Sequence, residues 1–275
     1  MTQTWFITGA NRGLGLEIAR SILAAGHNVV ATARKPDAIE VALGEHSNLL
    51  AVKLDVTNLD DASEAVAAAE TRFGGIDVLV NNAGYGQLGW FENTSDEKIR
   101  AQFETNVFGA MHVTRAVLPL MRKKRLGHVF TISSVAGIFA PAGGSIYSAS
   151  KFAVEGWMEG LTEELKPLGI KATIIEPGFF KTDFLDASSV IYGDYDIADY
   201  SEAARAFEEW HHNMNHQQVG DPAKLGAVLM ELNKIDNPLV RFAAGSDASG
   251  IVLKKAESIR ADAEHFKALS ASTDG

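Results

Sequence analysis

Short, continuously apolar runs alternate along this chain with longer segments in which apolar residues recur at helical spacing. The runs are about four to eight residues long and are bounded by Gly, Asn, Asp or Pro, as buried strands usually are. We predict strands at Thr4–Gly9, Asn28–Arg34, Leu49–Val56, Ile76–Asn81, His128–Ser133, Lys171–Glu176 and Leu239–Ala244, and helices at Leu14–Ala25, Leu59–Phe73, Asp96–Met121 and Tyr147–Leu168.

This alternation predicts an α/β fold of the doubly wound, Rossmann type, with a parallel sheet of about seven strands and helices on both faces. The turns are short and no linker or repeat interrupts the pattern, so residues 1–275 are expected to form a single domain. Residues 183–220 are polar, carry scattered aromatic side chains and lack an evident strand. We interpret them as an insertion near the ligand side, and we expect residues 270–275 to fray.

Composition narrows the classes of function. The formal net charge of -10 disfavours a surface for nucleic acid or anionic lipid. The absence of cysteine excludes disulfides, thiolate metal sites and a cysteine nucleophile. No secretion signal is evident at the start, and no uncharged stretch reaches the ~18–20 residues of a membrane helix. We therefore expect a soluble, cytoplasmic protein that binds neither nucleic acid nor membrane.

A glycine-rich loop, residues 8–15 (TGANRGLG), joins the first strand to the first helix. Its glycines, Gly9, Gly13 and Gly15, differ in spacing from the G-x-G-x-x-G of many dinucleotide-binding enzymes. Glycines there let the backbone approach a pyrophosphate, which the free N–H groups of the helix N-terminus can bind. A plain strand-to-helix turn would look similar, but the position after the first strand favours phosphate binding.

The end of the second strand distinguishes between two dinucleotides. An acidic residue there usually binds the ribose hydroxyl of NAD, whereas arginine accommodates the 2′-phosphate of NADP. Here Arg34 follows the strand without an acid, and Arg12 in the glycine loop can reach the same phosphate. The alternative is a pair of solvated surface arginines, but we favour NADP.

Two further polar segments end strands. Asp55 follows the third strand and can accept a hydrogen bond from adenine, or it can cap the next helix. Asn81–Gly84 (NNAG) follows the fourth strand, where small and amide residues suit a ligand crevice, although an ordinary turn is an equal alternative.

Tyr147 and Lys151 are separated by one helical turn, so they project from the same face of their predicted helix. A phenol with a pKa of about 10 is a poor acid–base catalyst at neutral pH, and a neighbouring ammonium is expected to lower that pKa. Ser133 and Ser134 stand at the end of the preceding strand, and a serine hydroxyl there can donate to the same substrate oxygen. Asn106 lies in the middle of a predicted helix and can hold a water near Lys151, or it can be a tolerated polar residue.

These residues resemble the compact, single-domain short-chain dehydrogenases/reductases. The likeness extends from about Thr4 to Thr182 and comprises, in order, TGANRGLG, LDVT, NNAG, Asn106, ISSVAG, YSASK and PGFFKT. The resemblance implies that Asn106, Ser134, Tyr147 and Lys151 form a catalytic tetrad, with Ser134 preferred over Ser133 by its spacing from the tyrosine. It also implies that Lys151 binds the nicotinamide ribose and that Pro177, Gly178 and Thr182 enclose the nicotinamide.

The expected function is therefore hydride transfer between NADP(H) and an alcohol or carbonyl substrate. The expected cofactor contacts are Gly9, Asn11, Arg12, Gly13, Leu14, Gly15, Arg34, Asp55, Val56, Asn82, Ala83, Gly84, Tyr147, Lys151, Pro177, Gly178 and Thr182. The alternative is a non-catalytic NADP-binding redox sensor on the same fold, although such a protein has no chemical need for all four tetrad residues.

Three features stay open at this level. Aromatic residues in and beside the insertion suggest an apolar or bulky substrate, or they simply pack the insertion. The resemblance implies a homodimer or homotetramer formed through the helices at 96–121 and 147–168. Glu208, His212 and His216 have the spacing of one helix face, but no accompanying motif supports a metal there, so no metal is expected.

Overall fold

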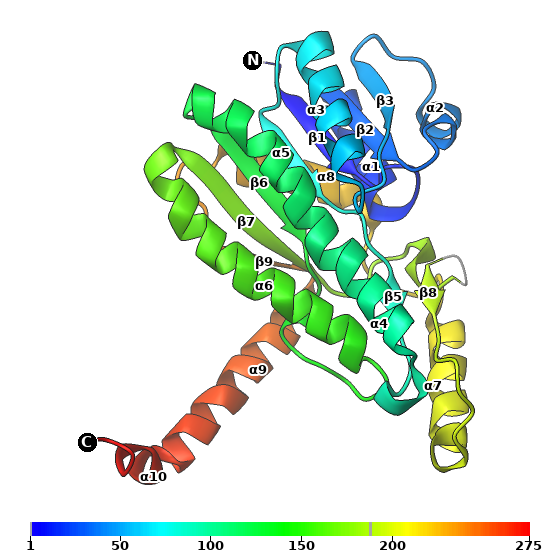
Figure 1. Cartoon of the computed structure of the whole chain (residues 1–275), viewed down its shortest axis with the longest axis vertical. Coiled ribbons are helices and arrows are strands. Elements are labelled where there is room, and N and C mark those ends of the chain that lie inside the picture. Colours follow the sequence, from blue (N-terminus) through cyan, green and yellow to red (C-terminus); the bar gives the residue numbers. More distant parts are fainter. Residues whose placement is uncertain (1, 187–188) are drawn as a thin grey trace.

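The computed structural model describes residues 2–186 and 189–275, and its centre is one parallel sheet (Figure 1). The strand order is β3-β2-β1-β4-β6-β7-β9, and every pairing is parallel. The predicted seven-strand, doubly wound sheet is therefore confirmed. Its strands are β1 (Thr4–Thr8), β2 (Asn28–Ala33), β3 (Leu49–Lys53), β4 (Val78–Asn81), β6 (Gly127–Ile132), β7 (Ile170–Pro177) and β9 (Arg241–Ala244).

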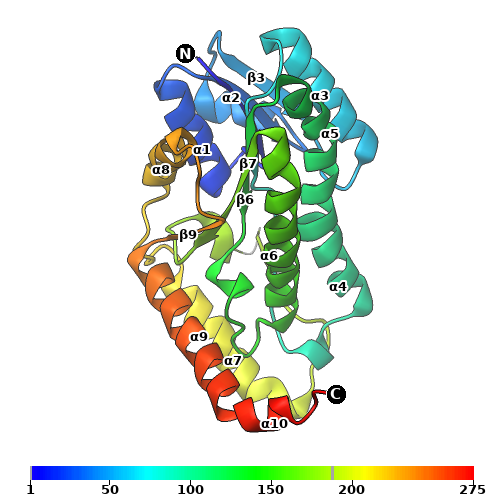
Figure 2. The same ribbon diagram turned by 90° about the vertical axis from the view of Figure 1, so that its left-hand side faces the viewer.

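Helices cover both faces of this sheet (Figure 2). One face packs against α3, α5 and α6, and the other packs against α1, α2 and α8. The helices are α1 (Gly13–Ala24), α2 (Asp37–Leu43), α3 (Leu59–Phe73), α4 (Asp96–Phe103), α5 (Gly109–Lys124), α6 (Ser145–Leu165), α7 (Ser201–Met214), α8 (Pro222–Lys234), α9 (Ser246–His265) and α10 (Lys267–Ala271).

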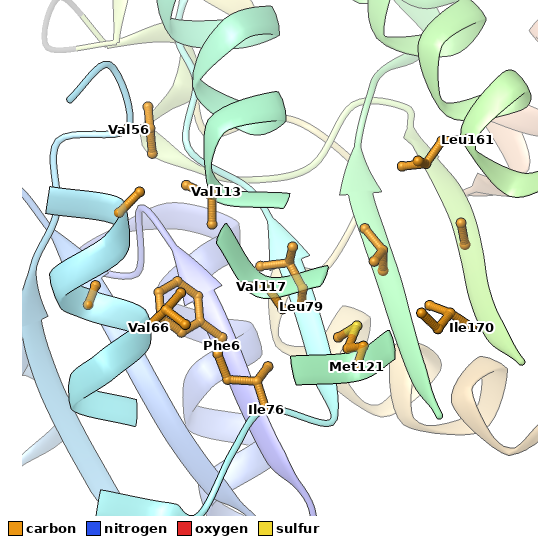
Figure 3. Close-up of a cluster of buried hydrophobic side chains, with 14 of the residues drawn as sticks. Phe6, Val56, Val66, Ile76, Leu79, Val113, Val117, Met121, Leu161 and Ile170 are labelled. Carbon is orange, nitrogen blue, oxygen red and sulfur yellow. The ribbon is translucent and has the colours of Figure 1, made fainter. Parts of the chain in front are cut away.

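The continuous apolar runs in the sequence follow from this two-sided burial. Along β1, Phe6 faces the α3–α5 side, whereas its neighbours Trp5 and Ile7 face the α1–α8 side. All three are fully buried, since successive side chains of a strand point to opposite faces. Figure 3 shows the first of these cores, where Phe6 lies near Val66 and Ile76. Each side of the sheet thus needs an apolar residue at every second position.

The strand order reverses direction between β1 and β4. From β1 the chain moves outward to β2 and β3, returns to β4 and then continues through β6, β7 and β9. The connection that follows β1 and the connection that follows β4 run to opposite faces of the sheet. This divergence opens a crevice at the carboxyl ends of the two strands. The glycine loop follows β1 and the Asn82–Gly84 segment follows β4, so both lie at this crevice.

The insertion is more regular than its sequence indicates. The expectation that 183–220 lacks a strand is wrong, because β8 (Val190–Ile191) pairs in parallel with β5 (Gly86–Gln87) to form a small second sheet. The insertion also contains the 3-10 helices η5 (Asp183–Leu185) and η6 (Ala198–Tyr200), and α7. Residues 187 and 188 of this segment lie outside the described residues.

Two other predicted features, the helix at 96–121 and the C-terminal tail, also need correction. The single helix expected at 96–121 is α4 and α5 joined by a π-helical segment, Glu104–Phe108. The tail expected to fray from 270 begins inside α10, which continues to Ala271. Helix α9 extends away from the sheet and carries the C-terminus to the end of the molecule opposite the N-terminus (Figures 1 and 2). Among the described residues, no helix is long and apolar enough to cross a membrane.

Candidate active site

The glycine loop takes up a conformation that side chains would obstruct. Gly9 and Gly13 have φ values of 64° and 55°, in the left-handed region that glycine adopts at low cost. A Cβ at Gly15 would overlap the carbonyl oxygen of Gly9 and the side-chain amide of Asn82. The loop leads into α1, whose first turn receives no side-chain cap. Its N–H groups therefore suit an anion such as a dinucleotide pyrophosphate.

Asn82 connects the two strand ends that border the crevice. Its side-chain Nδ2 donates to the carbonyl oxygens of Thr8, at 2.9 Å, and Gly9, at 3.1 Å. In return, Thr8 Oγ1 accepts from the backbone N–H groups of Asn82, at 2.9 Å, and Ala83, at 3.0 Å. Asn82 and Ala83 thus hold the glycine loop against the end of β4. Thr8 is a positioning residue that the sequence analysis did not identify, because a threonine in a strand usually signals only β propensity.

A pocket of about 760 Å³ opens beside the ends of β2 and β3. Arg34 and Asp55 both line it, as expected for the adenosine end of the cofactor. Asp55 Oδ1 accepts from Thr57 N and Thr57 Oγ1, whereas Asn58 caps α3. The alternative role of Asp55 as the helix cap is therefore wrong, because it holds the turn just before the cap. Val56 is buried against Gly109, and its carbonyl oxygen lies 3.2 Å from His112 Nδ1.

Asp61 is a supporting residue of this pocket that sequence reasoning missed. One carboxylate oxygen accepts from Asp55 N at 3.0 Å, and the other from Lys53 Nζ at 3.1 Å. These hydrogen bonds lower the pKa of Asp61. An aspartate in the first turn of a helix looks like a favourable dipole interaction, which hid this role.

The segment after β7 reaches back to the glycine loop. Gly178 lies so close to the carboxylate of Asp247 that a Cβ would overlap it, and Asp247 Oδ2 accepts from Phe179 N at 2.7 Å. Thr182 lies beside Gly13, since its Cβ is 3.8 Å from where a Gly13 Cβ would stand. The predicted nicotinamide end and the predicted phosphate end therefore adjoin across the crevice.

Tyr147 and Lys151 extend from the first turns of α6, as predicted. Lys151 Nζ lies 5.8 Å from the centre of the Tyr147 ring and donates to the carbonyl oxygen of Ile132 at 2.9 Å. Lys151 is 7% exposed, so its ammonium lies inside the protein rather than in solvent. The carbonyl of Ile132, at the end of β6, positions the lysine within reach of both the phenol and the crevice.

Burial dominates the proton affinity of both side chains. It raises the pKa of Tyr147 to about 12, whereas a hydrogen bond with Ser134 acts in the opposite direction. Burial also lowers the pKa of Lys151 to about 8, and the charge of Glu155 opposes that shift. The expected lowering of the Tyr147 pKa by Lys151 is wrong for this arrangement, because desolvation of the phenolate dominates and the opposing contribution comes from Ser134.

Ser134 lies where the sequence spacing predicts, directly after β6. Its Oγ caps the short 3-10 helix η3 (Val135–Gly137) by accepting from Ala136 N at 3.1 Å. The hydroxyl proton remains available in that geometry, because the hydroxyl acts there as an acceptor. The contact with the Tyr147 phenol places the two hydroxyls together at the crevice.

Asn106 lies in the π-helical segment between α4 and α5. Its Oδ1 accepts from Tyr85 N at 3.1 Å, and its Nδ2 donates to Tyr85 O at 3.0 Å and to Ser150 Oγ at 3.4 Å. Ser150 directly precedes Lys151, so Asn106 is next to the lysine-bearing turn of α6. A π-helical turn inside an α-helix often marks a functional site, and the tetrad residues converge here.

The aromatic residues of the insertion fall into separate groups. The Phe184 ring lies 5.5 Å from the Tyr147 ring, centre to centre. Phe207 packs against Trp90 at 5.7 Å, and Tyr200 packs against Trp90 at 6.1 Å. Of the predicted aromatics, Phe184 thus contacts the tetrad, whereas Tyr200 and Phe207 pack the insertion itself. The remaining members named in the sequence are Phe179, Phe180, Tyr192, Tyr195 and Trp210.

The metal alternative does not hold as the sequence framed it. Helix α7 ends at Met214, and His216 follows with a φ of 58°, so Glu208, His212 and His216 do not share one helix face. His216 instead approaches Asp183 and Asp186. Asp183 and Asp186 are partly exposed there, and His216 is exposed.

Three ionisable residues beside the tetrad escaped the sequence analysis altogether. Glu155 follows Lys151 by one turn of α6, Glu176 lies at the end of β7, and Arg241 begins β9. Glu176 was visible only as the last residue of a predicted strand, where a single acid is commonplace. Its complete burial is a tertiary property that no local pattern reveals.

Comparison with known proteins identifies the family of this fold. The family model for short chain dehydrogenases matches residues 3–192. The chain is 35% identical over 272 residues to oxidoreductase BOA17 of Botryotinia fuckeliana, covering 98% of each chain. It is 37% identical to a 3-ketodihydrosphingosine reductase of Bacteroides thetaiotaomicron, covering 88% of each.

A solved structure agrees with these sequence matches. A short-chain dehydrogenase from Streptomyces avermitilis superimposes with a TM-score of 0.90 at 36% identity, covering 100% of both chains. Two further solved structures of this fold hold a dinucleotide: a short chain dehydrogenase/reductase from Burkholderia phymatum is in complex with NAD, and a serine dehydrogenase is in complex with NADP+. The chain therefore belongs to the short-chain dehydrogenase family and is an oxidoreductase of that family.

Proposed function

We propose that this oxidoreductase uses NADP(H) to interconvert a carbonyl compound and its alcohol, with Tyr147 as the proton donor and acceptor. The single observation that carries the proposal is the convergence of Tyr147, Ser134 and Lys151 at the carboxyl ends of the central strands. Asn106 joins them through Ser150.

The cofactor would lie across this crevice. The glycine loop and the N-terminus of α1 would hold its pyrophosphate, and Arg34 with Arg12 would hold a 2′-phosphate. Asp55 and the backbone of Val56 would border the adenine, and the segment from Pro177 to Thr182 would border the nicotinamide. When bound, the reduced cofactor supplies the hydride that the carbonyl carbon receives. We favour NADP over NAD because Arg34 lines the adenosine-side pocket where an acid would oppose a phosphate.

The chain's own residues manage the oxygen and the proton. In reduction, Tyr147 Oη gives its proton to the carbonyl oxygen as negative charge develops there, and Ser134 orients that oxygen by hydrogen bonding. The ammonium of Lys151, 5.8 Å from the centre of the Tyr147 ring, places a positive charge beside the phenolate that remains and would bind the nicotinamide ribose. Asn106 holds the turn beside Lys151, where water can return the proton. Oxidation follows the same steps in reverse, with Tyr147 accepting the proton.

We further propose that the substrate is apolar or bulky. Phe184 lies against the Tyr147 ring, so a substrate carbonyl at Tyr147 would have an apolar side chain next to it. The relative from Bacteroides thetaiotaomicron, whose name denotes reduction of a long-chain ketone, is consistent with such a substrate. A homodimer or homotetramer through α4, α5 and α6, and a cytoplasmic location, complete the proposal.

The test is the substitution Tyr147→Phe, assayed with NADPH and a panel of apolar ketones and aldehydes. Removing the phenolic hydroxyl removes the proton donor, so turnover should fall by roughly 10²–10⁴-fold. Binding of NADPH, followed by fluorescence, should change little. Turnover equal to that of the unmodified protein would overturn the proposed chemistry. Retained binding without turnover in the unmodified protein would favour the redox-sensor alternative.

A further inference from the structure

Three carboxyl groups share one arginine behind the proposed active site. Arg241 Nε lies 3.1 Å from Glu155 Oε2 and 3.5 Å from Glu176 Oε1, and Arg241 Nη2 lies 2.5 Å from Glu159 Oε2. Glu155 and Glu159 come from α6, Glu176 from the end of β7 and Arg241 from the start of β9. The cluster therefore joins three elements of the fold at one point.

The cluster contains three carboxyl groups and one guanidinium group, and two of the carboxyl groups are buried. Glu176 is 0% exposed and Glu155 is 4% exposed, whereas Glu159 is largely in solvent. Both carboxyl oxygens of Glu176, and Oε1 of Glu155, lack a hydrogen-bond partner among the described residues. Two buried carboxylates beside one arginine would leave an uncompensated negative charge, which is costly inside a protein. One proton shared by the two groups removes that cost.

The proton affinities agree with a shared proton. Burial raises the pKa of Glu176 to about 7, and the charge of Glu155 acts in the same direction, whereas Arg241 opposes them. Burial also raises the pKa of Glu155, while Ser133 and Arg241 oppose that rise. Glu176 is thus the better proton holder and Glu155 the better carboxylate.

Glu155 faces the same interior as Lys151. The two residues are one turn apart on α6 and both are buried, and Glu155 is the charge that raises the pKa of Lys151 against its burial. The neighbouring η3 contributes no ionisable side chain, and Asp247 at the start of α9 accepts a hydrogen bond from Phe179 N. The charged groups that face Glu155 are therefore Lys151, Glu159, Glu176 and Arg241.

We propose that Glu155 and Glu176 hold one proton between them, and that the negative charge left on Glu155 keeps Lys151 in its ammonium form. This inference rests on the proposed role of Lys151 beside the Tyr147 phenolate. Glu155 and Glu176 are positioning residues, since they act on the reaction only through the charge of Lys151. With one proton on the pair, Glu155 and Glu176 carry one negative charge next to Lys151 rather than two.

The first experiment observes the proton directly. Infrared spectra of the full-length protein, recorded across a pH titration near neutrality, should contain the C=O band of a buried carboxylic acid. That band should be absent in Glu176→Gln and should remain in Glu159→Gln. A spectrum of the unmodified protein without such a band would overturn the shared proton. The spectrum of the unmodified protein gives this answer whether or not any variant folds.

The second experiment measures the charge of Lys151. Protein labelled with ¹³C at the lysine Cε carbons is titrated by NMR, and Lys151→Met assigns the signal. Glu155→Gln should lower the pKa of Lys151 by about 1 unit or more, because a neighbouring opposite charge typically shifts a pKa by ~1–3 units. Glu159→Gln, which removes an exposed carboxylate from the same arginine, should leave it unchanged. An unchanged pKa in a folded Glu155→Gln variant would overturn the inference.

Neither experiment needs a substrate or a cofactor, so their results separate from those of the activity tests. If Lys151 responds to Glu155 but Tyr147→Phe retains turnover, the charge relationship stands and the proposed chemistry fails. If Tyr147→Phe loses turnover and Lys151 does not respond, the chemistry stands and the acid pair fails. As an activity readout, the alkaline limb of the pH profile for kcat should move to lower pH in Glu155→Gln and not in Glu159→Gln.

Discussion

Phe184 lies against the ring of Tyr147, with the ring planes inclined by 49°. Thr182 positions it by accepting a hydrogen bond from Phe184 N at 3.3 Å. On its other side, Phe184 is so close to Gly86 that a Cβ there would stand 3.0 Å from the ring. The insertion therefore reaches the proposed proton donor through one aromatic side chain, which is bordered by the small second sheet.

Phe184→Ala should affect bulky substrates more than small ones. The substitution removes the apolar surface beside Tyr147, and loss of a buried aromatic contact costs roughly 1–3 kcal/mol of binding. KM for a bulky apolar ketone should rise about tenfold, whereas KM for a small ketone should change little. Phe266→Ala, between α9 and α10, is the control and should change KM for neither ketone. Equal changes for both ketones would show that Phe184 does not contact the substrate.

Arg34→Asp should change the cofactor preference. Arg34 lines the pocket at the end of β2, and replacing its cation by a carboxylate would repel a 2′-phosphate. Affinity for NADPH, measured by fluorescence titration, should fall roughly 10- to 100-fold, as expected for the loss of a charge-assisted hydrogen bond, while NADH should lose little. Arg122→Asp near the end of α5 controls for net charge. If the affinity for NADH fell by the same factor, Arg34 would not be the residue that binds the 2′-phosphate.

Two glycine substitutions should act in opposite directions. Gly15→Ala places a methyl group against Gly9 and Asn82, so it should lower the melting temperature and weaken NADPH binding. Gly156→Ala, in α6, has no atom within 4 Å of the new methyl group and should stabilise the protein by about 0.5–1 kcal/mol. Thermal unfolding with and without NADPH distinguishes them. A tolerated Gly15→Ala would mean that the loop shifts freely.

His128 should make the fold sensitive to acid. Burial and the charge of Lys171 lower the pKa of His128 to about 3, from 6.5 in an unfolded chain. The unfolded state binds the proton first, so the stability from this group is complete above pH 6.5 and is lost as the pH falls towards 3. The limiting slope is about 1.4 kcal/mol per pH unit. Urea unfolding at several pH values measures it.

The slope should shrink in His128→Gln, which has no proton to bind. His128 contacts Asn233 Oδ1 at 3.1 Å and Thr173 Oγ1 at 3.0 Å, and glutamine retains a polar group there at some cost in stability. The comparison therefore concerns the slope rather than the absolute free energy of unfolding. His265→Gln, on the exposed end of α9, should leave the slope unchanged. An undiminished slope in His128→Gln would assign the acid sensitivity to other groups.

Sequence patterns predicted the sheet well because burial on both faces of parallel strands demands uninterrupted apolar runs. Phe6, Leu79 and Val129 are buried on one face, and Ile7, Val80 and Phe130 on the other. Tyr147 and Lys151 were equally predictable, because one helix fixes their relative positions. By contrast, β8 pairs only two residues with a distant partner, so its strand character comes from tertiary contact rather than from its own sequence.

Other parts of the site depend on contacts between distant segments. The π-helical turn at Asn106 has no distinctive composition, and its amide bonds with Tyr85 follow from the docking of two elements. The raised pKa of Tyr147 likewise depends on how deeply the phenol is buried, which residue spacing does not encode. Sequence reasoning named the candidate reacting groups, whereas their proton affinities required the structure.

Arg241 makes the last strand of the sheet necessary for the charge balance behind the site. A chain that ended before residue 241 would contain Asn106, Ser134, Tyr147 and Lys151, but the buried acids Glu155 and Glu176 would lack the cation that lies beside them. Burying two acids without that cation costs free energy, so we expect such a truncated chain to pack α6 against β7 less stably than the full-length protein does.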